Sequence, residues 1–586
     1  MKETETSIPK SEDHWFRRLR RRLYRLYYRA KYVPFAAERR ARHEADQRGF
    51  VVVQIDALAH DDLQRALRRG YMPQIQRLMD REAYELRRYP AGLPSATPAA
   101  QAAIFHGTKA RIPAFRWYEK GARKIIVGSQ RDSMQFIRDR LPEDGVLRGG
   151  SSYVNLYDGG AARSVFTLAA RETRPLFEQI GGGRLLLLLL LHPFRLARMA
   201  LVGVLEYLRE EKDRLLSQIR GESTYYWWYL PLLHIGANVV LRELQTLAVL
   251  LDIYTGAPVI YTTYNTYDEF AHHFGPSSET ALKNLRALDR RLGEILRMTR
   301  RLPGRPYDVI ILSDHGQTPA VPYRIRYGET LGDTIVAAQK HGVHVLAGTG
   351  TYAPATEAIQ FLATEVEEIS ATSSRPTRSL GLRFTRWLRE AYSPFPLVAE
   401  NVRVSDEQRL VVTYSSSLAH VYWTDPAHPI GLDEIRADDD RRALYYFLVA
   451  HEGIGLVITR MLDGAHVESQ EGRAIVMPDG EMEVIKGQNP LEDYADVPAA
   501  RRAIVHLATL PNAGDLVLIG AYDPAEDLCV CFDDQVGAHG GIGGRQFWPF
   551  LLSPPDWVPE GRTLQDPLDL HPLLDRYTRQ EPAPNR

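Results

Sequence analysis

The sequence predicts an α/β fold in which buried strands alternate with amphipathic helices. Two apolar, β-branched runs, 50–55 (FVVVQI) and 307–313 (YDVIILS), are typical of strands that are buried on both faces. An apolar stripe at helical spacing over 282–295 lies between them. Each strand leads into an aspartate, Asp56 or Asp314, at the carboxyl-terminal end, which is where open α/β sheets place their sites.

Size and composition limit the range of functions. The 586 residues leave room for roughly two to four domains, and 44% hydrophobic and 25% charged residues are ordinary for a globular protein. Equal numbers of basic and acidic residues, 73 of each, provide no overall attraction to nucleic acid. The two cysteines, Cys529 and Cys531, point to opposite faces of a strand-like run, so neither a disulfide framework nor a cysteine-based zinc site is expected.

The N-terminal region contains a basic amphipathic helix over 16–31, with eight lysines and arginines and no acidic residue. This helix has three interpretations: it packs on the protein body, it lies on an anionic membrane surface, or it binds nucleic acid. We do not expect the third, because no nucleic-acid-binding fold accompanies the helix. The residues before it have no apolar signal-peptide core. We therefore expect a cytoplasmic protein, with peripheral contact on the inner face of the membrane as an extension of that prediction.

A helical and unusually apolar insertion is predicted over about 167–255. It contains seven consecutive leucines at 185–191 and the apolar, aromatic stretch 225–241. No window offers 18 consecutive apolar residues, so no membrane span is predicted. The insertion is interpreted as a cap on the site, an oligomer interface or a membrane-contact element, the last of these acting through 184–241 together with 16–31.

A hydroxyl group is predicted at a helix start in the segment 93–108 (LPSATPAAQAAIFHGT). Ser95, Thr97 and Pro98 indicate a helix N-terminus with a hydroxyl at the N-cap. Such a hydroxyl serves as a cap, or it lies where helix amides favour an anion and attack on phosphorus is feasible. The following segments 114–118 and 153–166 combine aromatic residues, arginine and glycine, which fits either a pocket wall or ordinary loop packing.

Acid–imidazole pairs form the most informative pattern. Asp268 and His272 are four residues apart after the strand-like run 258–264, and Asp314 is followed directly by His315. His539 stands in the glycine-rich segment 537–545, where glycine lets the backbone pass close to an ion or phosphate. One such pair alone is more often a turn or a cap. With Asp56 and Thr97 added, the set is large enough for two divalent ions with an open position for substrate.

The remaining chain is divided by composition. Residues 350–505 mix helical pieces with strand candidates at 410–414, 419–423, 454–459 and 474–477, and no chemistry is evident there. The run 515–522 returns to a buried strand pattern. The predicted domains are a basic arm (1–48), a first core part (49–345), an inserted α+β subdomain (346–505) and core completion with a tail (506–586).

The motifs resemble the alkaline phosphatase superfamily, and within it the type I phosphodiesterase/nucleotide pyrophosphatase group. The resemblance rests on five parts in order: Asp56, then 94–97 with Gly107, then 268–276 (DEFAHHFGP), then 314–316 (DHG), then His539-Gly540. It covers roughly 49–345 and 500–555. It implies a three-layer αβα sandwich of alkaline phosphatase type. The predicted helical insertion and the inserted α+β subdomain are additions that the group does not explain.

The resemblance also implies a metal-dependent phosphodiesterase. One ion would be held by Asp268, His272 and His539. The other would be held by Asp56, Asp314 and His315, with Thr97 as the nucleophile on that ion and a phospho-threonine intermediate. Mixed aspartate and histidine ligands favour zinc, with manganese as the alternative.

The substrate is expected to be a phosphate ester, either of nucleotide type or a lipid head group. The sequence lacks the C/S-x-P-x-R pattern of sulfatases, and Ala99-Ala100 replace the asparagine that nucleotide-hydrolysing members carry soon after the nucleophile. Monoester hydrolysis or phosphoryl transfer by the same site is an alternative. A membrane-surface scaffold that retains the fold is an alternative of another class.

Overall fold

The computed structural model describes residues 47–109, 111–169, 230–339, 344–347, 404–405, 407–494 and 497–578, with a few isolated positions. The predicted basic helix 16–31 and most of the apolar stretch 184–241 therefore lie outside the described residues. Within the described part of the chain, no helix combines the length and the apolarity that a membrane span needs. The predicted membrane contacts are not tested by these residues.

A central seven-stranded sheet forms the core of the molecule, as the buried apolar runs predicted. Its spatial order is β2 (Glu85–Arg88), β21 (Phe550–Ser553), β8 (Tyr307–Leu312), β1 (Gly49–Ile55), β7 (Val259–Tyr264), β5 (Ser151–Tyr153) and β6 (Arg163–Val165). The five strands from β8 to β6 run parallel, and β21 is antiparallel to β8. Every residue of β1 is buried, because helices cover both faces of the sheet.

Strand β7 shows how the two faces are covered. Tyr261 and Thr263 point to α5 (Thr97–His106): the Tyr261 ring packs edge-on against Phe105, and Gln101 donates to the Thr263 hydroxyl. The alternate residue Thr262 points to α10 (Leu230–Thr255), where it accepts a hydrogen bond from a glutamine side chain. This alternation is the period-two pattern of a strand that is buried on both sides. The chain is therefore a three-layer αβα sandwich.

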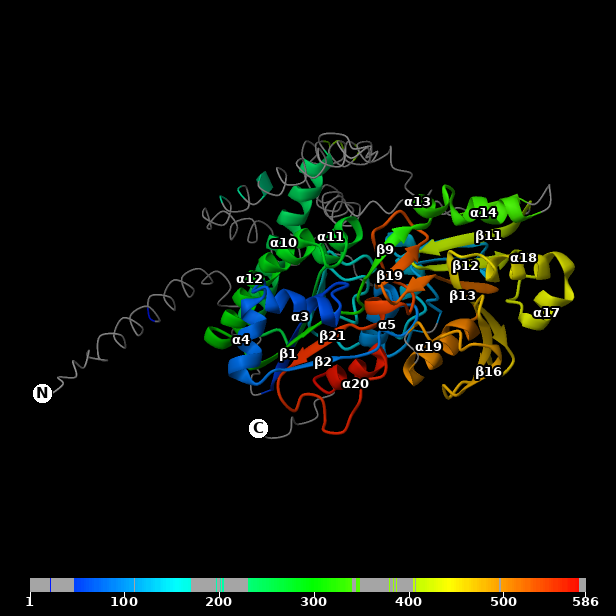
Figure 1. Ribbon diagram of the computed structural model, residues 1–586. Coiled ribbons are helices and arrows are strands. Elements are labelled where there is room, and N and C mark those ends of the chain that lie inside the picture. Colours follow the sequence, from blue (N-terminus) through cyan, green and yellow to red (C-terminus); the bar gives the residue numbers. More distant parts are fainter. Residues whose placement is uncertain are drawn as a thin grey trace, which may run out of the picture.

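The helices fall into two layers around this sheet. Figure 1 shows α3, α4, α10 and α12 gathered on one side and α5 with α20 on the other. The bounds not yet given are α3 (His60–Arg68), α4 (Pro73–Glu82), α6 (Arg131–Arg138), α11 (Thr266–Phe274), α12 (Glu279–Arg301) and α20 (Leu570–Asp575). Helix α12 begins where the Ser278 side chain accepts a hydrogen bond from the Ala281 amide, and its leucine stripe is buried.

A second, eight-stranded sheet lies beside the central one (Figure 1). Its order is β10 (His344–Ala347), β11 (Gln408–Ser415), β12 (Leu418–Trp423), β17 (Leu516–Gly520), β13 (Ile454–Met461), β14 (Gly464–Glu468), β15 (Gly472–Val476) and β16 (Met482–Gly487). It is antiparallel except for the β10–β11 pair. Helix α19 (Pro498–Thr509) contacts β13, β14 and β15. Among the described residues, four further helices belong to this half of the chain: α13 (Tyr323–Tyr327), α14 (Leu331–Ala338), α17 (Leu432–Ala437) and α18 (Asp439–Val449).

Two small sheets connect the halves. One has the order β18 (Tyr522–Asp523), β19 (Leu528–Cys531), β9 (Thr318–Pro322) and β20 (Gly537–Ala538), and the other pairs β3 (Arg116–Glu119) with β4 (Lys124–Val127). Strand β17, from the segment predicted to complete the core, pairs inside the second sheet. The domain boundaries stay a prediction, but the two halves are interleaved along the chain.

Candidate active site

The first acid–imidazole group lies at the carboxyl-terminal ends of two neighbouring parallel strands. Asp56 directly follows β1, and Asp314 and His315 follow β8, the strand that pairs with β1. One ligand atom from each of the three side chains lies within 4.8 Å of the others. All three residues are buried. The parallel register alone therefore brings these side chains together.

Thr97 adjoins this group. It is the first residue of α5, and the N-cap position belongs to Ala96, which makes no side-chain cap. The prediction that a hydroxyl caps this helix is therefore wrong, because the Thr97 side chain turns toward the acidic group instead. Its Oγ1 donates to Asp56 Oδ1 at 3.2 Å and lies 3.2 Å from His315 Nε2.

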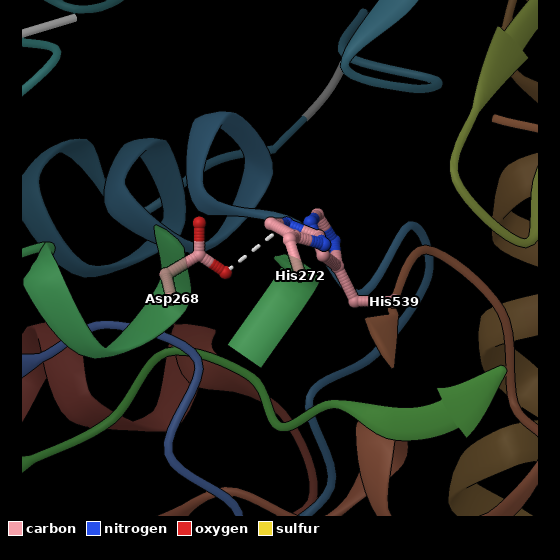
Figure 2. Close-up of side chains that lie close together, drawn as sticks. All are labelled: Asp268, His272 and His539. Atoms are coloured by element: carbon pink, nitrogen blue, oxygen red, sulfur yellow. Dashed lines mark ion pairs between the residues drawn. The ribbon is translucent and has the colours of Figure 1, made fainter. Parts of the chain in front are cut away.

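The second acid–imidazole group joins one helix to a distant loop. Asp268 and His272 lie one turn apart on α11, with 3.3 Å between Asp268 Oδ1 and His272 Nε2. His539, which follows β20, completes the group, and the three ligand atoms lie within 4.8 Å of one another. Figure 2 shows the Asp268 carboxylate and the two imidazoles turned toward each other.

The two groups are adjacent. The rings of His315 and His539 stack with 4.3 Å between their centroids, and the centroids of His272 and His539 are 5.1 Å apart. The structure thus brings all seven residues that the sequence singled out into one site. They come from five separate segments of the chain.

The three imidazoles share one hydrogen-bonding pattern. In each, Nδ1 lies against a backbone carbonyl: Gly537 for His272 (2.7 Å), Gly316 for His315 (3.0 Å) and Ser95 for His539 (3.0 Å). A carbonyl oxygen only accepts, so Nδ1 carries a proton in each ring, and Nε2 is the nitrogen that faces the acidic groups. A backbone carbonyl on the far nitrogen is the usual way in which proteins orient a metal-binding histidine.

The electrostatics of the site agree with that pattern. Burial, together with the neighbouring imidazoles of His315 and His272, holds the pKa of His539 well below its usual value, so this ring is neutral. Burial by itself would raise the pKa of Asp268. The ion pair with His272 outweighs that effect, so the pKa of Asp268 lies below its usual value and the carboxylate is ionised. A neutral imidazole and an ionised carboxylate are the forms that bind a cation.

The donor sets fit divalent metal ions. Each group offers carboxylate oxygens and imidazole Nε2 atoms in a buried setting. Asp314 Oδ2 is buried without a hydrogen-bond partner among the described residues. An ion at this position would compensate a buried carboxylate oxygen that is otherwise costly. Three ligands per group leave positions open for other oxygen atoms.

The sequence did not reveal a serine turn that holds His539. Strands β11 and β12 are joined by the two-residue turn Ser416–Ser417. The His539 amide donates to Ser416 Oγ at 3.2 Å, and Ser417 Oγ donates to the His539 carbonyl at 2.8 Å. Ser416 has a φ of 63°, a left-handed conformation that glycine adopts more readily. The side-chain contacts therefore come with a strained backbone. The sequence showed only that serines lie between two strand-like runs, as in many hairpin turns, and this did not indicate a role in the site.

Gln317 is a second residue that the motifs missed. Its Nε2 donates to Asp268 Oδ1 at 2.5 Å and to the Asp268 carbonyl at 3.2 Å. It lies three residues after Asp314, so it ties the ends of the two motifs together. Its position directly after the DHG motif (314–316) was the only sequence signal.

A cavity opens above both groups. It is lined by Asp56, Thr97, Gln101, Phe115, Arg116, Val154, Asn155, Leu156, Thr263, Asn265, Asp268, His272, Ser415, Ser416, Asp533, Gln535 and His539. Of the two interpretations of 114–118 and 153–166, the pocket wall is therefore correct. The segment 350–505, in which no chemistry was evident, contributes two serines to this wall.

Comparison with known families identifies part of this chain. Residues 232–413 match the family model described as type I phosphodiesterase / nucleotide pyrophosphatase. The match spans just under a third of the chain and contains Asp268, His272, Asp314 and His315. No curated protein matches the chain.

Solved structures with a related fold are remote. Phosphonoacetate hydrolase from Sinorhizobium meliloti 1021, in complex with phosphonoformate, is 14% identical, with a TM-score of 0.39 over 91% of this chain and 96% of that one. Murine ectonucleotide pyrophosphatase/phosphodiesterase 5, in complex with AMP, is 11% identical, with a TM-score of 0.43 over 92% and 97%. The alkaline phosphatase PafA is 12% identical, with a TM-score of 0.45 over 92% and 97%. Similarities this remote do not indicate which substrate this protein binds.

The family match and the acid–imidazole groups agree on the kind of chemistry. The matched segment supplies four of the seven site residues, and Asp56, Thr97 and His539 join them from outside it. The resemblance stated from the motifs is thereby confirmed for this segment: residues 232–413 match the type I phosphodiesterase/nucleotide pyrophosphatase model.

Proposed function

We propose that this protein is a two-metal phosphodiester hydrolase in which Thr97 is the nucleophile. The observation that carries the proposal is the position of Thr97 Oγ1, which lies 3.2 Å from both Asp56 Oδ1 and His315 Nε2. The hydroxyl takes no part in capping its own helix. It lies at the N-terminus of α5, where the helix dipole favours an anion such as a phosphoryl group.

The two groups would hold one ion each. Asp56, Asp314 and His315 would hold the ion nearer to Thr97, and Asp268, His272 and His539 would hold the other. Mixed carboxylate and imidazole donors favour zinc, with manganese as the alternative. When bound, the ions supply positive charge that lowers the pKa of a neighbouring hydroxyl and stabilises charge on the transferring phosphoryl group.

The reaction divides into two displacements at phosphorus. Thr97 Oγ1 gives up its proton to solvent water and forms a bond to phosphorus, while the bond to the leaving alkoxide breaks. The alkoxide departs from the face opposite Thr97 and takes a proton from water. A water molecule then attacks the phospho-threonine, the Thr97 oxygen leaves and recovers a proton, and the remaining phosphate monoester is released. Atoms and charges balance without a further reactant.

The size of the cavity supports recognition of the phosphoryl group itself. Its enclosed volume is about 40 Å³, which corresponds to roughly three water-sized groups. This space suits a phosphoryl group, so the organic parts of the ester would extend toward the open side. Nucleotide-type esters and lipid head groups both present such a group, and an assay with each separates these two substrates.

Hydrolysis of bis-p-nitrophenyl phosphate tests the proposal. The metal-loaded protein should cleave the diester, and Thr97→Ala should lower kcat by about 10³-fold or more, because the nucleophile is removed. Thr97→Ser, which keeps the hydroxyl, is the matched control and should retain most of the activity. Full activity in Thr97→Ala, or no metal-dependent cleavage by the unchanged protein, would refute the proposal. Parallel assays with p-nitrophenyl phosphate determine whether monoesters are better substrates.

A further inference from the structure

Arg116 is the cationic side chain of the cavity. Among the described residues that line the cavity, it is the one lysine or arginine. It is the first residue of β3 and is 6% exposed. Thr97, Asp56, His272 and His539 line the same cavity. A buried cation in an acidic, metal-binding cavity calls for a physical explanation, because burial of a charge is costly unless the charge is paired.

One nitrogen of the Arg116 guanidinium is held in place by protein groups. Nη1 donates to both carboxylate oxygens of Asp533, at 3.2 and 3.3 Å, and to the Tyr414 carbonyl at 3.2 Å. The Arg116 amide donates to Ser415 Oγ at 2.9 Å, which ties the start of β3 to the hairpin of the second sheet. Asp533 is itself buried and accepts a hydrogen bond from the Ser416 amide at 2.8 Å. The orientation of the guanidinium is therefore fixed.

The opposite edge of the guanidinium lacks partners. Nε is buried without a hydrogen-bond partner, and Nη2 makes no hydrogen bond to any described residue. Nε and Nη2 share one edge of the planar group, and their N–H bonds point in the same direction. Two oxygens of one tetrahedral anion match such an edge, which makes a bidentate, charge-assisted contact.

We propose that the Nε–Nη2 edge of Arg116 binds two non-bridging oxygens of the phosphoryl group that Thr97 attacks. This inference rests on the proposed function and adds a substrate-binding residue to it. Thr97 and Arg116 line the same cavity, so an oxyanion beside Thr97 would lie in the space that Arg116 borders. Asp533 balances the charge of Arg116 when the cavity is empty of substrate, which lets the cation remain buried.

The proposal assigns a distinct task to each side of the cavity. The acid–imidazole groups face the attacking and leaving oxygens, whereas Arg116 faces the oxygens that stay on phosphorus throughout. Lysine would supply the charge without the planar edge, so the two residues are not equivalent here. Inorganic phosphate, which has the same oxygens, should also bind and should compete with the ester.

Substitution of Arg116 in the metal-loaded full chain tests this role. Arg116→Gln should weaken the binding of inorganic phosphate, measured by calorimetry and as a competitive inhibition constant, by about 10- to 100-fold, which is the usual effect of losing a charged hydrogen-bonding pair. The value of kcat/KM for the diester should fall at least as far. Arg116→Lys should recover only part of the phosphate affinity.

A matched control separates this effect from damage to the fold. Arg138 is also buried, pairs with Asp158 through Nε at 2.6 Å and does not line the cavity. Arg138→Gln breaks a comparable ion pair and should leave phosphate affinity unchanged in the folded fraction. Metal content and thermal unfolding are measured for every variant. If Arg116→Gln does not fold, the comparison of Arg116→Lys with the unchanged protein decides.

The outcomes distinguish this inference from the proposed function. If Arg116→Gln or Arg116→Lys binds phosphate as tightly as the unchanged protein, the bidentate contact is refuted, while ester hydrolysis by the unchanged protein still supports the proposed function. If the unchanged protein hydrolyses no ester, the proposed function fails. The phosphate calorimetry then decides by itself whether Arg116 forms an oxyanion site.

Discussion

The two acid–imidazole groups are assembled in different ways, and only the first is buried throughout, because His539 of the second is partly exposed. Asp56, Asp314 and His315 follow β1 and β8, which are hydrogen-bonded neighbours in one sheet. Asp268 and His272 share one helix, but their third member, His539, comes from a loop that the serine turn of the second sheet holds. The first group thus depends on the central sheet alone, whereas the second depends on contact between both halves of the molecule. We therefore expect substitutions and changes of pH to affect metal binding at the two groups differently.

The largest expected effect comes from removing one carboxylate of either group. Asp314→Asn should remove about one equivalent of metal and leave the second group loaded, and Asp268→Asn should do the reverse. Each change should lower diester hydrolysis by about 10³-fold or more, because both ions act on the same displacement. Metal content after dialysis, measured by mass spectrometry, checks this expectation. Loss of both metals from Asp314→Asn would show that the groups are not independent.

The next largest effect is expected in mild acid, which should destabilise the half with the second sheet more than the half with the central sheet. Burial lowers the pKa of His420 on β12 and of His466 on β14 to about 4, and that of His106 on α5 to about 4 as well. Each folded-state pKa lies below the value of about 6.5 in the unfolded chain. These histidines therefore do not lower the free energy of unfolding above pH 6.5. Below that pH each of them lowers it by about 1.4 kcal/mol per pH unit as the pH drops toward 4.

Two of these three histidines belong to the second sheet, so that half should loosen first. Urea unfolding between pH 7 and pH 5, followed by hydrogen exchange of β12 and β14 against β1 and β8, measures the difference. His420→Gln removes one titrating group, and in that variant the pH dependence of the second sheet should be shallower. Equal loss of protection in both sheets would contradict this expectation.

The smallest effect is expected at the serine turn. Ser416→Gly removes the hydroxyl that accepts from the His539 amide and also relieves a backbone with a φ of 63°. The free energy of unfolding should change by no more than about 1 kcal/mol, because the two consequences oppose each other. Metal affinity at the second group should fall by about 10-fold, as it does when a supporting residue of a metal ligand is lost.

Ser416→Ala sharpens the test, because it removes the hydroxyl but keeps the strain. It should lose the same metal affinity as Ser416→Gly and be less stable. Titration of the metal-free protein with Co²⁺, followed by visible absorption, reads the two groups separately. Unchanged affinity in both variants would mean that the turn does not position His539.

The sequence predicted those features that depend on residues close to one another in the chain. The uniform β-branched composition of 50–55 was sufficient for a buried strand, and the carboxyl end of that strand placed Asp56 correctly. Asp268 and His272 were singled out as an acid–imidazole pair four residues apart, and the structure places them one turn apart on α11. Seven side chains are brought together because each lies at a strand end, a helix start or a glycine-rich turn that the sequence marks.

Long-range partners were not predictable in the same way. Nothing in the spacing of 415–417 indicates that a hairpin of another sheet contacts His539, since hydrogen bonds between distant segments leave no periodic signal. Arg116 and Asp533 are 417 residues apart, and each has an ordinary local sequence. Local rules left two roles open for the hydroxyl of the segment 93–108, a helix cap or a reactive group. Tertiary contacts of Thr97 with Asp56 and His315 decide against the cap.

The pairing of Ser95 with the loop around His539 has a consequence for biosynthesis. Ser95 and Gly540 exchange backbone hydrogen bonds, and the His539 ring contacts the Ser95 carbonyl across 444 residues of sequence. At roughly 5–20 residues per second, the ribosome needs about 20 to 90 seconds between these two points. A nascent chain holding only the first segment has no complete second group. A chain that ends before His539 therefore lacks one of the three side chains of the second group.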